Sequence, residues 1–504
     1  MKSISINNFS GGIDDPRATV NGACTSSRHF MLGRTKLTPY RDMETESLAG
    51  GESLVNQKLT DVIRYNYTGS TTQIFALGQT GLADFNPRFY QKSTVDTVTA
   101  TFGVISNGED TTGVVIGGSL IGYKGNLYCL KTLTGNTTLV KHTYGVSTAD
   151  VGTIGATPDG SVAIVPQPLI HPKDNKMYLA SGNVVKSYDG SSLSSAVTFS
   201  ADYVITSITW SGNNILLGAV RKDNGNSVGL LWSGSTTSAE LIDVIDFGSD
   251  ALIVLENIND VVIGVSGVSL GGSLNVGIQN TVTIRGYNGG SAEIIKQIES
   301  VGSTGSRVYP FKGKQDNKMY FPMSAYLNGE QIHQIWSVYK NEQGEWVVTP
   351  DRKINNNTEL TGTITGFSVV SDYIWVAFNN DGSFYRTNDQ DVFTATSQYI
   401  TTVNPNMETS DRSKKKQLKA VSLRCGSPTS ASHTVTLSVS ADGGAYETIY
   451  SGASSSKTRV IEEVKLANGK SFLDAREYMF KIETTGNGEV YELKYGYEII
   501  PTLI

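Results

Sequence analysis

The amino-acid sequence predicts an all-β protein in which a β-propeller of roughly seven blades lies between an extended N-terminal arm and a C-terminal β-sandwich. The first observation is composition: 17% of the 504 residues are charged, 53 are Gly and 24 are Tyr. Tyr, Thr, Val and Ile favour half-buried strands, whereas Gly and Asn favour tight turns. The other observations are a hairpin pattern that recurs along residues 49–403 and a polar–apolar alternation over residues 418–504.

Residues 1–48 carry turn signals and no clear hairpin, which predicts an extended arm. Within this arm, the segment Ser3–Ile6 has the alternation of a short strand. The opening MKSISINNFSGG lacks the apolar region of a secretory signal peptide, and no stretch reaches the roughly 18 apolar residues of a membrane helix. We therefore expect a protein that folds in the cytoplasm and has no membrane-spanning segment.

The central region, residues 49–403, repeats a turn rich in Asp, Asn or Gly followed by an apolar strand. The pentapeptide DNKMY occurs twice, at Asp174–Tyr178 and at Asp316–Tyr320. Looser copies of the pattern have strands that begin near residues 73, 127, 177, 215, 261, 319 and 373. A spacing of about 40 to 60 residues is typical of a four-stranded propeller blade, which covers its apolar faces by packing against its neighbours. We expect the two pentapeptides to form equivalent turns and inner strands of two blades, with chance identity as the alternative.

A run of β-sandwiches is the competing architecture for this region, whereas the short, strict repeat of a β-helix is missing from the sequence. One helix is predicted over residues 291–300. Ser291 would cap it, and Ile294, Ile295 and Ile298 would share one of its faces. We expect this helix to be an insertion between blades.

The C-terminal boundary is a polar and charged linker at residues 404–417. After the linker, residues 418–504 predict one β-sandwich. Val435, Leu437 and Val439 should point to one side of a strand there, and the intervening Thr and Ser residues to the other.

Both ends of the chain resemble a group of tailed-bacteriophage virion proteins. The opening INNFSGGIDDPRATVNGACTSSRHFMLGRTKLTPYRD contains an Asn-Phe-Ser-Gly-Gly-Ile start at residues 8–13 and a later Gly33…Leu37…Pro39…Arg41 phrase. The closing stretch, from KQLKAVSLRC to YELKYGYEIIP, is similar to the terminal β-sandwich of such proteins. These are propeller-bearing tail proteins of the nozzle, adaptor or tail-tip type.

The resemblance implies a protein that forms a homo-oligomeric ring around the tail axis and links neighbouring tail or head–tail connector proteins. It implies a virion location after assembly in the host cytoplasm, with DNA able to pass a central channel without sequence-specific contact. A net charge of −6 agrees with a channel wall that does not grip phosphates. In such assemblies the arm contacts neighbouring subunits, so Phe9, Gly11, Gly12 and Arg17 are the expected partner-binding residues of the arm.

Two further features are candidate binding sites. The basic run Lys414, Lys415 and Lys416 would contact an acidic neighbouring subunit or DNA, with a solvated linker as the alternative. Trp346 follows a hairpin turn in NEQGEWVVTP and is the tryptophan best placed to stack on a sugar ring. Trp336 and Trp375 fall within apolar strands and should be buried.

The sequence contains no motif that predicts catalysis, a metal site or a cofactor. No predicted strand–turn–helix forms a Gly-x-Ser-x-Gly nucleophile elbow, and HExxH is missing. Cys24, Cys129 and Cys425 are too few and too far apart for a disulfide framework or a zinc cluster. The segment SADGGAY resembles the Asp-box turn of sialidases but occurs once. We therefore expect a structural protein that is not an enzyme. A receptor- or glycan-binding tail protein is the first alternative, and a polysaccharide-degrading tail enzyme is the second.

Overall fold

A computed structural model describes residues 2–6, 24–28, 30–31, 38–39, 43–45, 59–70, 73–79, 85–92, 101–158, 164–269, 281–299, 307–327, 330–341, 344–353, 364–370, 373–378, 384–387, 397–401, 411, 413–426, 433–454, 459–461, 473–486 and 488–500. The elements of this part of the chain are β-strands, and it contains no helical segment with the length and apolarity needed to span a bilayer.

The chain forms two compact units, each built from segments that are not contiguous in sequence. We call them the propeller unit (Glu44–His333 and Leu360–Asp389) and the sandwich unit (Met1–Met43, Gln334–Glu359 and Gln390–Ile504).

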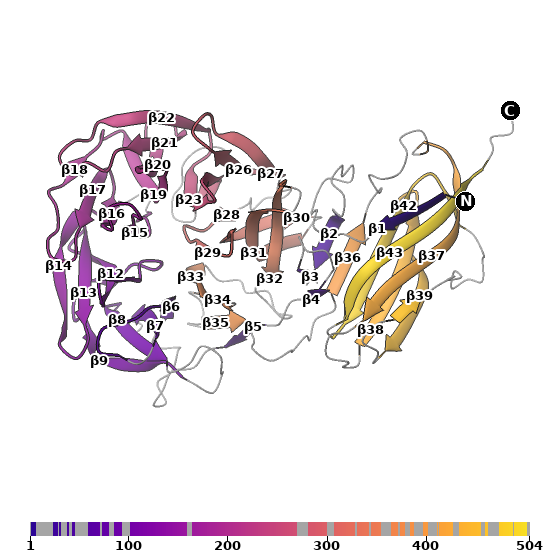
Figure 1. Ribbon diagram of the computed structural model, residues 1–504, viewed down its shortest axis with the longest axis horizontal. Helices are drawn as coiled ribbons and strands as arrows, with labels where there is room; N and C mark the ends of the chain where they lie inside the picture. The colour runs from indigo at the N-terminus through magenta and orange to yellow at the C-terminus, as the bar shows by residue number, and fades with distance from the viewer. Residues whose placement is uncertain are drawn as a thin grey trace. The chain divides into compact units, whose positions relative to one another are not determined.

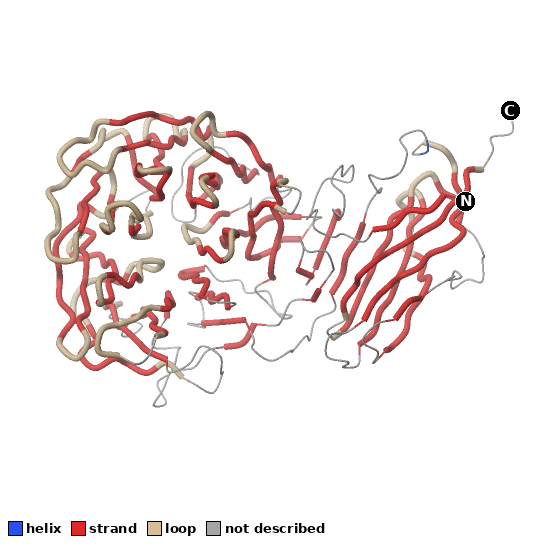
Figure 2. The backbone as a smooth tube through the Cα atoms, in the orientation of Figure 1, coloured by secondary structure: helices blue, strands red, loops and turns tan. Residues whose placement is uncertain are grey.

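The propeller unit contains seven sheets that follow one another around a ring (Figure 1), as the sequence predicts. Strand makes up most of its backbone, with loops at the strand ends (Figure 2). The first three sheets are formed by β6 (Leu59–Arg64), β7 (Ile74–Gln79), β8 (Pro87–Lys92) and β9 (Gly103–Glu109); by β10 (Val114–Val115), β11 (Ile121–Tyr123), β12 (Asn126–Leu133), β13 (Asn136–Thr143) and β14 (Ser147–Ala156); and by β15 (Leu169–Ile170), β16 (Met177–Ser181), β17 (Val184–Tyr188) and β18 (Val197–Thr198).

The remaining sheets of the ring repeat this plan with small variations. They contain β19 (Tyr203–Ser211), β20 (Asn214–Arg221), β21 (Ser227–Trp232) and β22 (Leu241–Gly248); β23 (Leu252–Ile258), β24 (Val261–Ser266), β26 (Thr281–Tyr287) and β27 (Glu293–Glu299); β25 (Val268–Ser269), β28 (Arg307–Val308), β29 (Gly313–Gln315), β30 (Lys318–Leu327), β31 (Glu330–Lys340) and β32 (Trp346–Lys353); and β33 (Ile364–Val370), β34 (Tyr373–Phe378), β35 (Phe384–Thr387) and β5 (Met43–Thr45).

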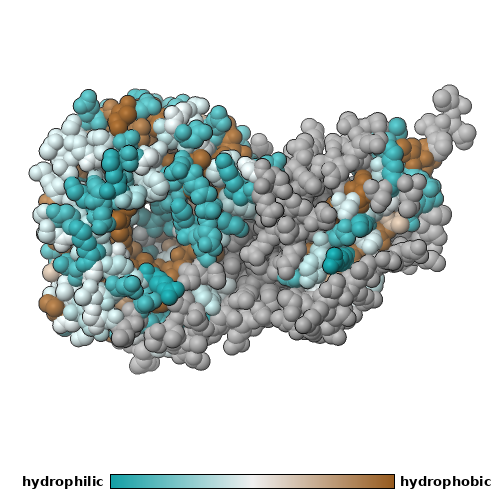
Figure 3. All heavy atoms as spheres, in the orientation of Figure 1, coloured by the Kyte–Doolittle hydropathy of each residue, from teal (hydrophilic) through white to brown (hydrophobic). Residues whose placement is uncertain are grey.

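Buried apolar clusters between neighbouring sheets hold the ring together. One cluster joins the third and fourth sheets around Tyr178 and Trp232. Another packs Val62 and Ala76 of the first sheet against Trp375 of the seventh, so the last sheet covers the first and the ring closes. Because these apolar surfaces lie between sheets, the visible face of the unit is mostly hydrophilic or intermediate in hydropathy (Figure 3). This arrangement is a propeller and excludes the competing run of sandwiches.

The seventh sheet takes one of its strands from a distant part of the sequence. Its strand order is β33-β34-β35-β5, and β5 precedes the first sheet along the chain. Backbone hydrogen bonds in this sheet therefore join the two ends of the propeller sequence. The segment predicted as an arm, residues 1–48, thus supplies a strand of the ring.

The two copies of DNKMY each lie in a turn that precedes a strand, but the turns are not equivalent. Residues 171–176 join Ile170 to Met177 in the third sheet, whereas Asp316 and Asn317 alone join Gln315 to Lys318 in the sixth. Asn175 in the third sheet and Asp316 and Asn317 in the sixth have φ angles of 52°, 48° and 51°. Asn and Asp tolerate this left-handed region better than most residues. Met177 and Met319 are fully buried, as expected. The strands that follow these turns, β16 and β30, each have paired strands on both sides and are not the innermost strands of their sheets.

The predicted helix over residues 291–300 is wrong. Residues Glu293–Glu299 form β27, which pairs antiparallel with β26 and completes the fifth sheet. Isoleucine favours strands, and without β27 the backbone groups along one edge of β26 would be unpaired. Backbone pairing with β26 therefore favours the strand more strongly than the spacing of the isoleucines favours a helix.

The sandwich unit has two main sheets around one apolar core. Val435, Leu437 and Val439 are buried in that core, which confirms the predicted alternation. The first sheet contains β1 (Lys2–Ile6), β43 (Glu489–Ile499), β37 (Lys416–Gly426), β40 (Arg459–Ile461) and β41 (Leu473–Ala475); the second contains β2 (Cys24–Arg28), β36 (Ser397–Thr401), β42 (Tyr478–Thr485), β38 (His433–Ala441) and β39 (Glu447–Ser454); and β3 (Phe30–Met31) pairs with β4 (Thr38–Pro39).

Candidate functional site

The residues predicted to bind partners fall in two places. Phe9, Gly11, Gly12 and Arg17 lie outside the described residues. The run Lys414–Lys416 lies in the sandwich unit, immediately before and at the start of β37.

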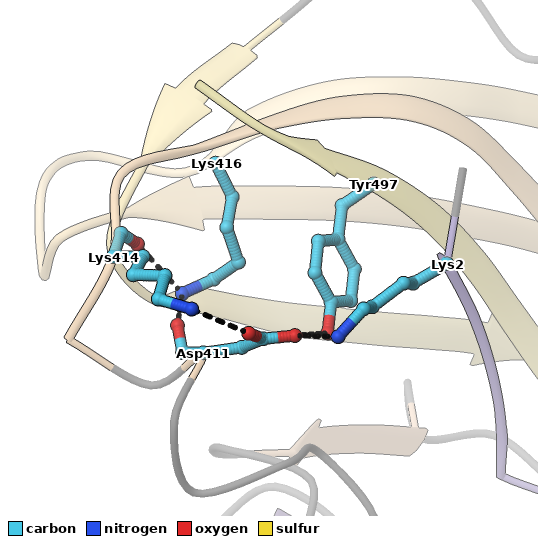
Figure 4. Close-up of polar contacts among 5 residues, drawn as sticks. All are labelled: Lys2, Asp411, Lys414, Lys416 and Tyr497. Carbon is cyan, nitrogen blue, oxygen red and sulfur yellow. Dashed lines mark hydrogen bonds and ion pairs between the residues drawn. The ribbon is translucent and has the colours of Figure 1, made fainter. Parts of the chain in front are cut away.

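The lysine run surrounds a single carboxylate, and together with a strand from the N-terminal segment it forms the Asp411 cluster: Lys2, Asp411, Lys414, Lys416 and Tyr497 (Figure 4). The Asp411 side chain is only 1% exposed. Its Oδ2 lies 2.6 Å from Nζ of Lys2 and accepts the Tyr497 hydroxyl at 3.2 Å, and its Oδ1 lies 3.3 Å from Nζ of Lys414. Ammonium groups from two distant segments therefore meet at one buried anion.

The three lysines of the run have different surroundings. Lys416 is buried, and its ammonium donates to the backbone oxygens of Asp411 at 2.6 Å and Lys414 at 2.9 Å. Burial lowers the pKa of Lys416. The side chains of Lys414 and Lys415 are 48% and 60% exposed, and Nζ of Lys415 lies 3.6 Å from Asp474. Two of the predicted lysines therefore remain accessible, and the third supports the fold.

The charges of this cluster keep Asp411 ionised. The ammonium group of Lys2 is the largest cause of a decrease in the pKa of Asp411 to about 2, with smaller contributions from Lys414 and Tyr497. At neutral pH Asp411 is therefore a carboxylate, and it lies beside the side chains of Lys2, Lys414 and Lys416.

A charged groove adjoins this cluster in the sandwich unit. Ser413, Lys415, Asp442, Arg476 and Glu477 line it. Oδ1 of Asp442 accepts the backbone N–H groups of Arg476 at 2.8 Å and Glu477 at 2.9 Å. Asp442 belongs to the SADGGAY segment, which forms a turn after β38, as expected. The accessible cations and anions of this groove suit a polar protein partner.

A second groove lies in the propeller unit, along β22 and the hairpin of β26 and β27. Its volume is about 410 Å³, within the range of about 300 to 1,000 Å³ for small-molecule pockets. We call it the rim groove; its lining includes Asp243, Val244, Asp246, Gly248 and Arg285, with residues 290–292.

Two carboxylates and a guanidinium group line the rim groove. Asp246 accepts the N–H of Gly248 at 2.7 Å through Oδ1, and Asp243 accepts the N–H of Val244 at 2.8 Å. Nη1 of Arg285 donates to the backbone oxygen of Ala292 at 3.5 Å. Both aspartates are exposed, so each keeps an oxygen that can accept from a ligand.

Sequence reasoning missed the rim groove because β22 reads as an ordinary strand. The only available signal was the pair of carboxylates in LIDVIDFG beside exposed apolar residues. Ile242 is 55% exposed and Val244 is 47% exposed.

Side chains between β28 and β29 of the sixth sheet reach residues of other sheets. A methyl group added to Gly118, in the second sheet, would lie 2.8 Å from the ring of Phe311. Nζ of Lys312 lies 3.0 Å from the backbone oxygen of Ile208 and 3.0 Å from the carboxylate of Glu256. Gly118 and Ile208 belong to sheets that are not neighbours of the sixth, whereas Glu256 belongs to the neighbouring fifth sheet.

Asp61 is a buried carboxylate on the innermost strand of the first sheet. Its oxygens accept the N–H groups of Gly118 at 2.7 Å and Ser119 at 3.1 Å, in the second sheet. Burial raises the pKa of Asp61 to about 7 despite these hydrogen bonds. Asp61 therefore attaches the first sheet to the second.

Trp346, the predicted sugar-stacking residue, begins β32 and is half-buried. Nζ of Lys340 lies 4.9 Å from the centroid of its ring, so one part of the aromatic surface is occupied by a cation. Trp336 and Trp375 are 2% and 0% exposed, which confirms their predicted burial.

No protein-family model and no curated protein matches this sequence. Solved structures similar to the chain include the WD40 β-propeller domain of Doa1, with 14% identity, a TM-score of 0.38, and coverage of 69% of this chain and 96% of that one. An exo-β-1,3-galactanase from Phanerochaete chrysosporium has 12% identity, a TM-score of 0.31, and coverage of 78% and 98%. A PL25 ulvan lyase has 9% identity, a TM-score of 0.39, and coverage of 71% and 95%.

The prediction that this protein is not an enzyme is contradicted by these comparisons. A galactanase and a polysaccharide lyase are among the similar structures, so resemblance to a propeller does not argue against catalysis. At 9–12% identity the likeness concerns the fold and assigns no activity to this chain.

Proposed function

We propose that this protein is a tail component of a tailed bacteriophage that recognises a cell-surface glycan through the rim groove of its propeller. The proposal joins the phage-like ends of the sequence to one structural observation. That observation is a groove of small-molecule size lined by two exposed carboxylates and a guanidinium group.

The chemistry of the rim groove suits a saccharide. Sugar hydroxyls donate to carboxylates and accept from guanidinium groups, and hydrogen bonds to charged partners are worth about 1.5 to 3 kcal/mol each. Asp243, Asp246 and Arg285 supply both kinds of partner. The exposed side chain of Val244 offers an apolar surface for the C–H face of a ring.

Binding of the purified protein to a glycan array and to polysaccharide from host cells tests this proposal. We expect the double variant Asp243→Asn/Asp246→Asn to lose about tenfold or more in affinity, because charged hydrogen-bond acceptors become neutral amides. Asp223→Asn is the matched control, because Asp223 is an exposed carboxylate that pairs with Arg221 outside the groove. Equal binding by the variant and the control would contradict the proposal, as would a protein that binds no glycan.

The same polysaccharide serves to test for catalysis. New reducing ends after incubation would indicate hydrolysis, and an unsaturated product would indicate elimination. If either product formed, its loss in the Asp243→Asn/Asp246→Asn variant would place the reaction in the rim groove.

A second function, linking neighbouring subunits around the tail axis, is favoured by the sandwich unit. Lys414, Lys415 and Arg476 present accessible cations beside the carboxylates of Asp442 and Glu477. Mixed charges of this kind support specific contact with a polar protein surface. The test is the protein's presence in purified virions and its position in averaged particle images. A chain missing from virions would contradict both the tail location and the linking role.

A further inference from the structure

Strand β1 covers one edge of β43, whose other edge pairs with β37. The antiparallel register runs from Lys2 opposite Tyr497 to Ile6 opposite Leu493. The backbone groups on this edge of β43 therefore receive their partners from the N-terminal segment.

The side chains of β1 make specific contacts in addition to the backbone pairing. Ile4 and Ile6 are 6% and 3% exposed and belong to the core of the sandwich. Lys2 reaches the buried carboxylate of Asp411, and the Ser5 hydroxyl donates to Glu492 at 2.7 Å. The rest of the sandwich therefore offers β1 a strand edge for backbone pairing, apolar sites for Ile4 and Ile6, and a carboxylate for Lys2. Strand edges with side-chain pockets of this kind are a common way in which proteins bind an added strand.

The length of the chain between β1 and β2 does not restrict β1 to the sheet of its own copy. Residues 7–23 separate it from β2, and 17 residues can span up to about 56 Å. A second copy of the chain offers the same edge and the same sites. Strand β1 can pair within its own copy or with a second copy. Which pairing prevails depends on the local concentration of neighbouring copies relative to the effective concentration of the tethered strand, which is of millimolar order for short linkers.

We propose that in the assembled protein β1 of one copy docks on the β43 edge of a second copy, so that each copy donates a strand to its neighbour. The inference rests on the proposed subunit-linking role and names its partner and its element. Exchange of an identical element keeps every contact of the donated strand, so its main free-energy cost is that of bringing two copies together.

Cysteine variants of the full chain test the exchange, because Ser5 lies opposite Lys494 in the register. One preparation carries Ser5→Cys, the other carries Lys494→Cys, and both carry Cys24→Ser. The two are mixed, concentrated toward the millimolar range, incubated in sub-denaturing urea and oxidised. We expect disulfide-linked dimers that require both variants. A mixture of Ser5→Cys with Lys419→Cys is the matched control, because Lys419 lies on β37, which β43 separates from β1.

A labelled peptide with the sequence MKSISINN provides a second measurement that does not depend on disulfide geometry. We expect the full chain to take it up and a Lys2→Met peptide to bind about tenfold more weakly, because Asp411 then loses an ammonium partner. No dimer above the control together with no peptide uptake would overturn the proposal. If light scattering still shows oligomers in that case, strand exchange is wrong and subunit linking stands; a protein that stays monomeric at every concentration overturns both.

Discussion

The two units of this protein hold themselves together in different ways. In the propeller unit the same kind of attachment recurs between successive sheets. The hydroxyl of Tyr65, after the first strand of the first sheet, accepts the N–H of Gly125 in the turn of the second sheet at 2.6 Å. The hydroxyl of Tyr123 donates to the backbone oxygen of Asn175 in the turn of the third sheet at 2.5 Å.

Hydroxyls on the innermost strands repeat the pattern elsewhere in the ring. Ser207 accepts the N–H of Leu255 at 2.9 Å, and Ser368 accepts the N–H of Val62 at 2.9 Å. The second of these bonds joins the seventh sheet to the first. Stability of the ring is therefore spread over many similar contacts, as in other repeat architectures.

The sandwich unit instead depends strongly on one short strand. Strand β1 closes a sheet edge, inserts two isoleucines in the core and brings Lys2 to Asp411. A small change in β1 should therefore affect its whole unit, whereas a similar change in the propeller should remain local.

The largest effect is expected from Ile4→Ala combined with Ile6→Ala. Each truncation of a buried isoleucine costs about 2 to 5 kcal/mol, so the pair should remove much of the stability of the sandwich unit. Hydrogen exchange followed by mass spectrometry should show lost protection in β37, β42 and β43 and unchanged protection in β6–β9. Ser5→Ala, on the other face of β1, is the control and should have a smaller effect. Equal loss of protection in both units would break the comparison.

The next effect concerns Asp61 and the pH dependence of the propeller unit. Its pKa is about 7 in the folded protein and about 3.9 in an unfolded chain, so between these values the folded state binds a proton that the unfolded state does not. Stability should therefore fall as pH rises from about 4 to 7, by up to about 4 kcal/mol. Urea unfolding of the propeller unit at pH 5 and pH 8 measures the difference. Asp61→Asn should flatten it, and a variant with the wild-type slope would show that another group titrates.

A smaller effect with the opposite sign is expected in the sandwich unit. The lowered pKa of Asp411 stabilises the unit above pH 4, and this contribution is lost as pH falls toward 2. Lys2→Met removes the largest cause of the shift, so acid unfolding of the sandwich should begin at a higher pH. The effect is limited because the Lys2 side chain is 44% exposed and screened by water. Lys415→Met is the control, because the Lys415 side chain is 60% exposed and lies 3.6 Å from Asp474 rather than beside Asp411, and it should move the acid midpoint less.

The sequence predicted the ring from features that act within a few residues. Asp, Asn and Gly turns mark hairpins wherever the left-handed conformation is required, and Asp316 and Asn317 adopt it. The alternation of apolar and polar residues is enough to predict that Val435 faces the core. Such local signals were enough for the class of fold and the number of blades.

Contacts between distant segments were not predictable in the same way. Nothing near Lys2 indicates that it meets Asp411, because the two are brought together only when β1 pairs with β43. The helix predicted at Ser291 failed for the same reason, since the fifth sheet rather than local spacing decides the conformation of β27. The rim groove likewise depends on two hairpins that meet after folding.

The smallest expected effects test whether the attachments of the propeller act independently. Tyr65→Phe and Tyr123→Phe each remove one hydroxyl between two sheets, and each should cost about 1 kcal/mol in urea unfolding. Because the two bonds join different pairs of sheets, the double variant should show the sum of the single effects. In the sandwich, Lys2→Met and Ile4→Ala alter the same strand, so their combined cost should be less than the sum once either change has released β1. Additivity in the sandwich, or strong coupling between the tyrosines, would mean that the two units do not differ in how they distribute their stability.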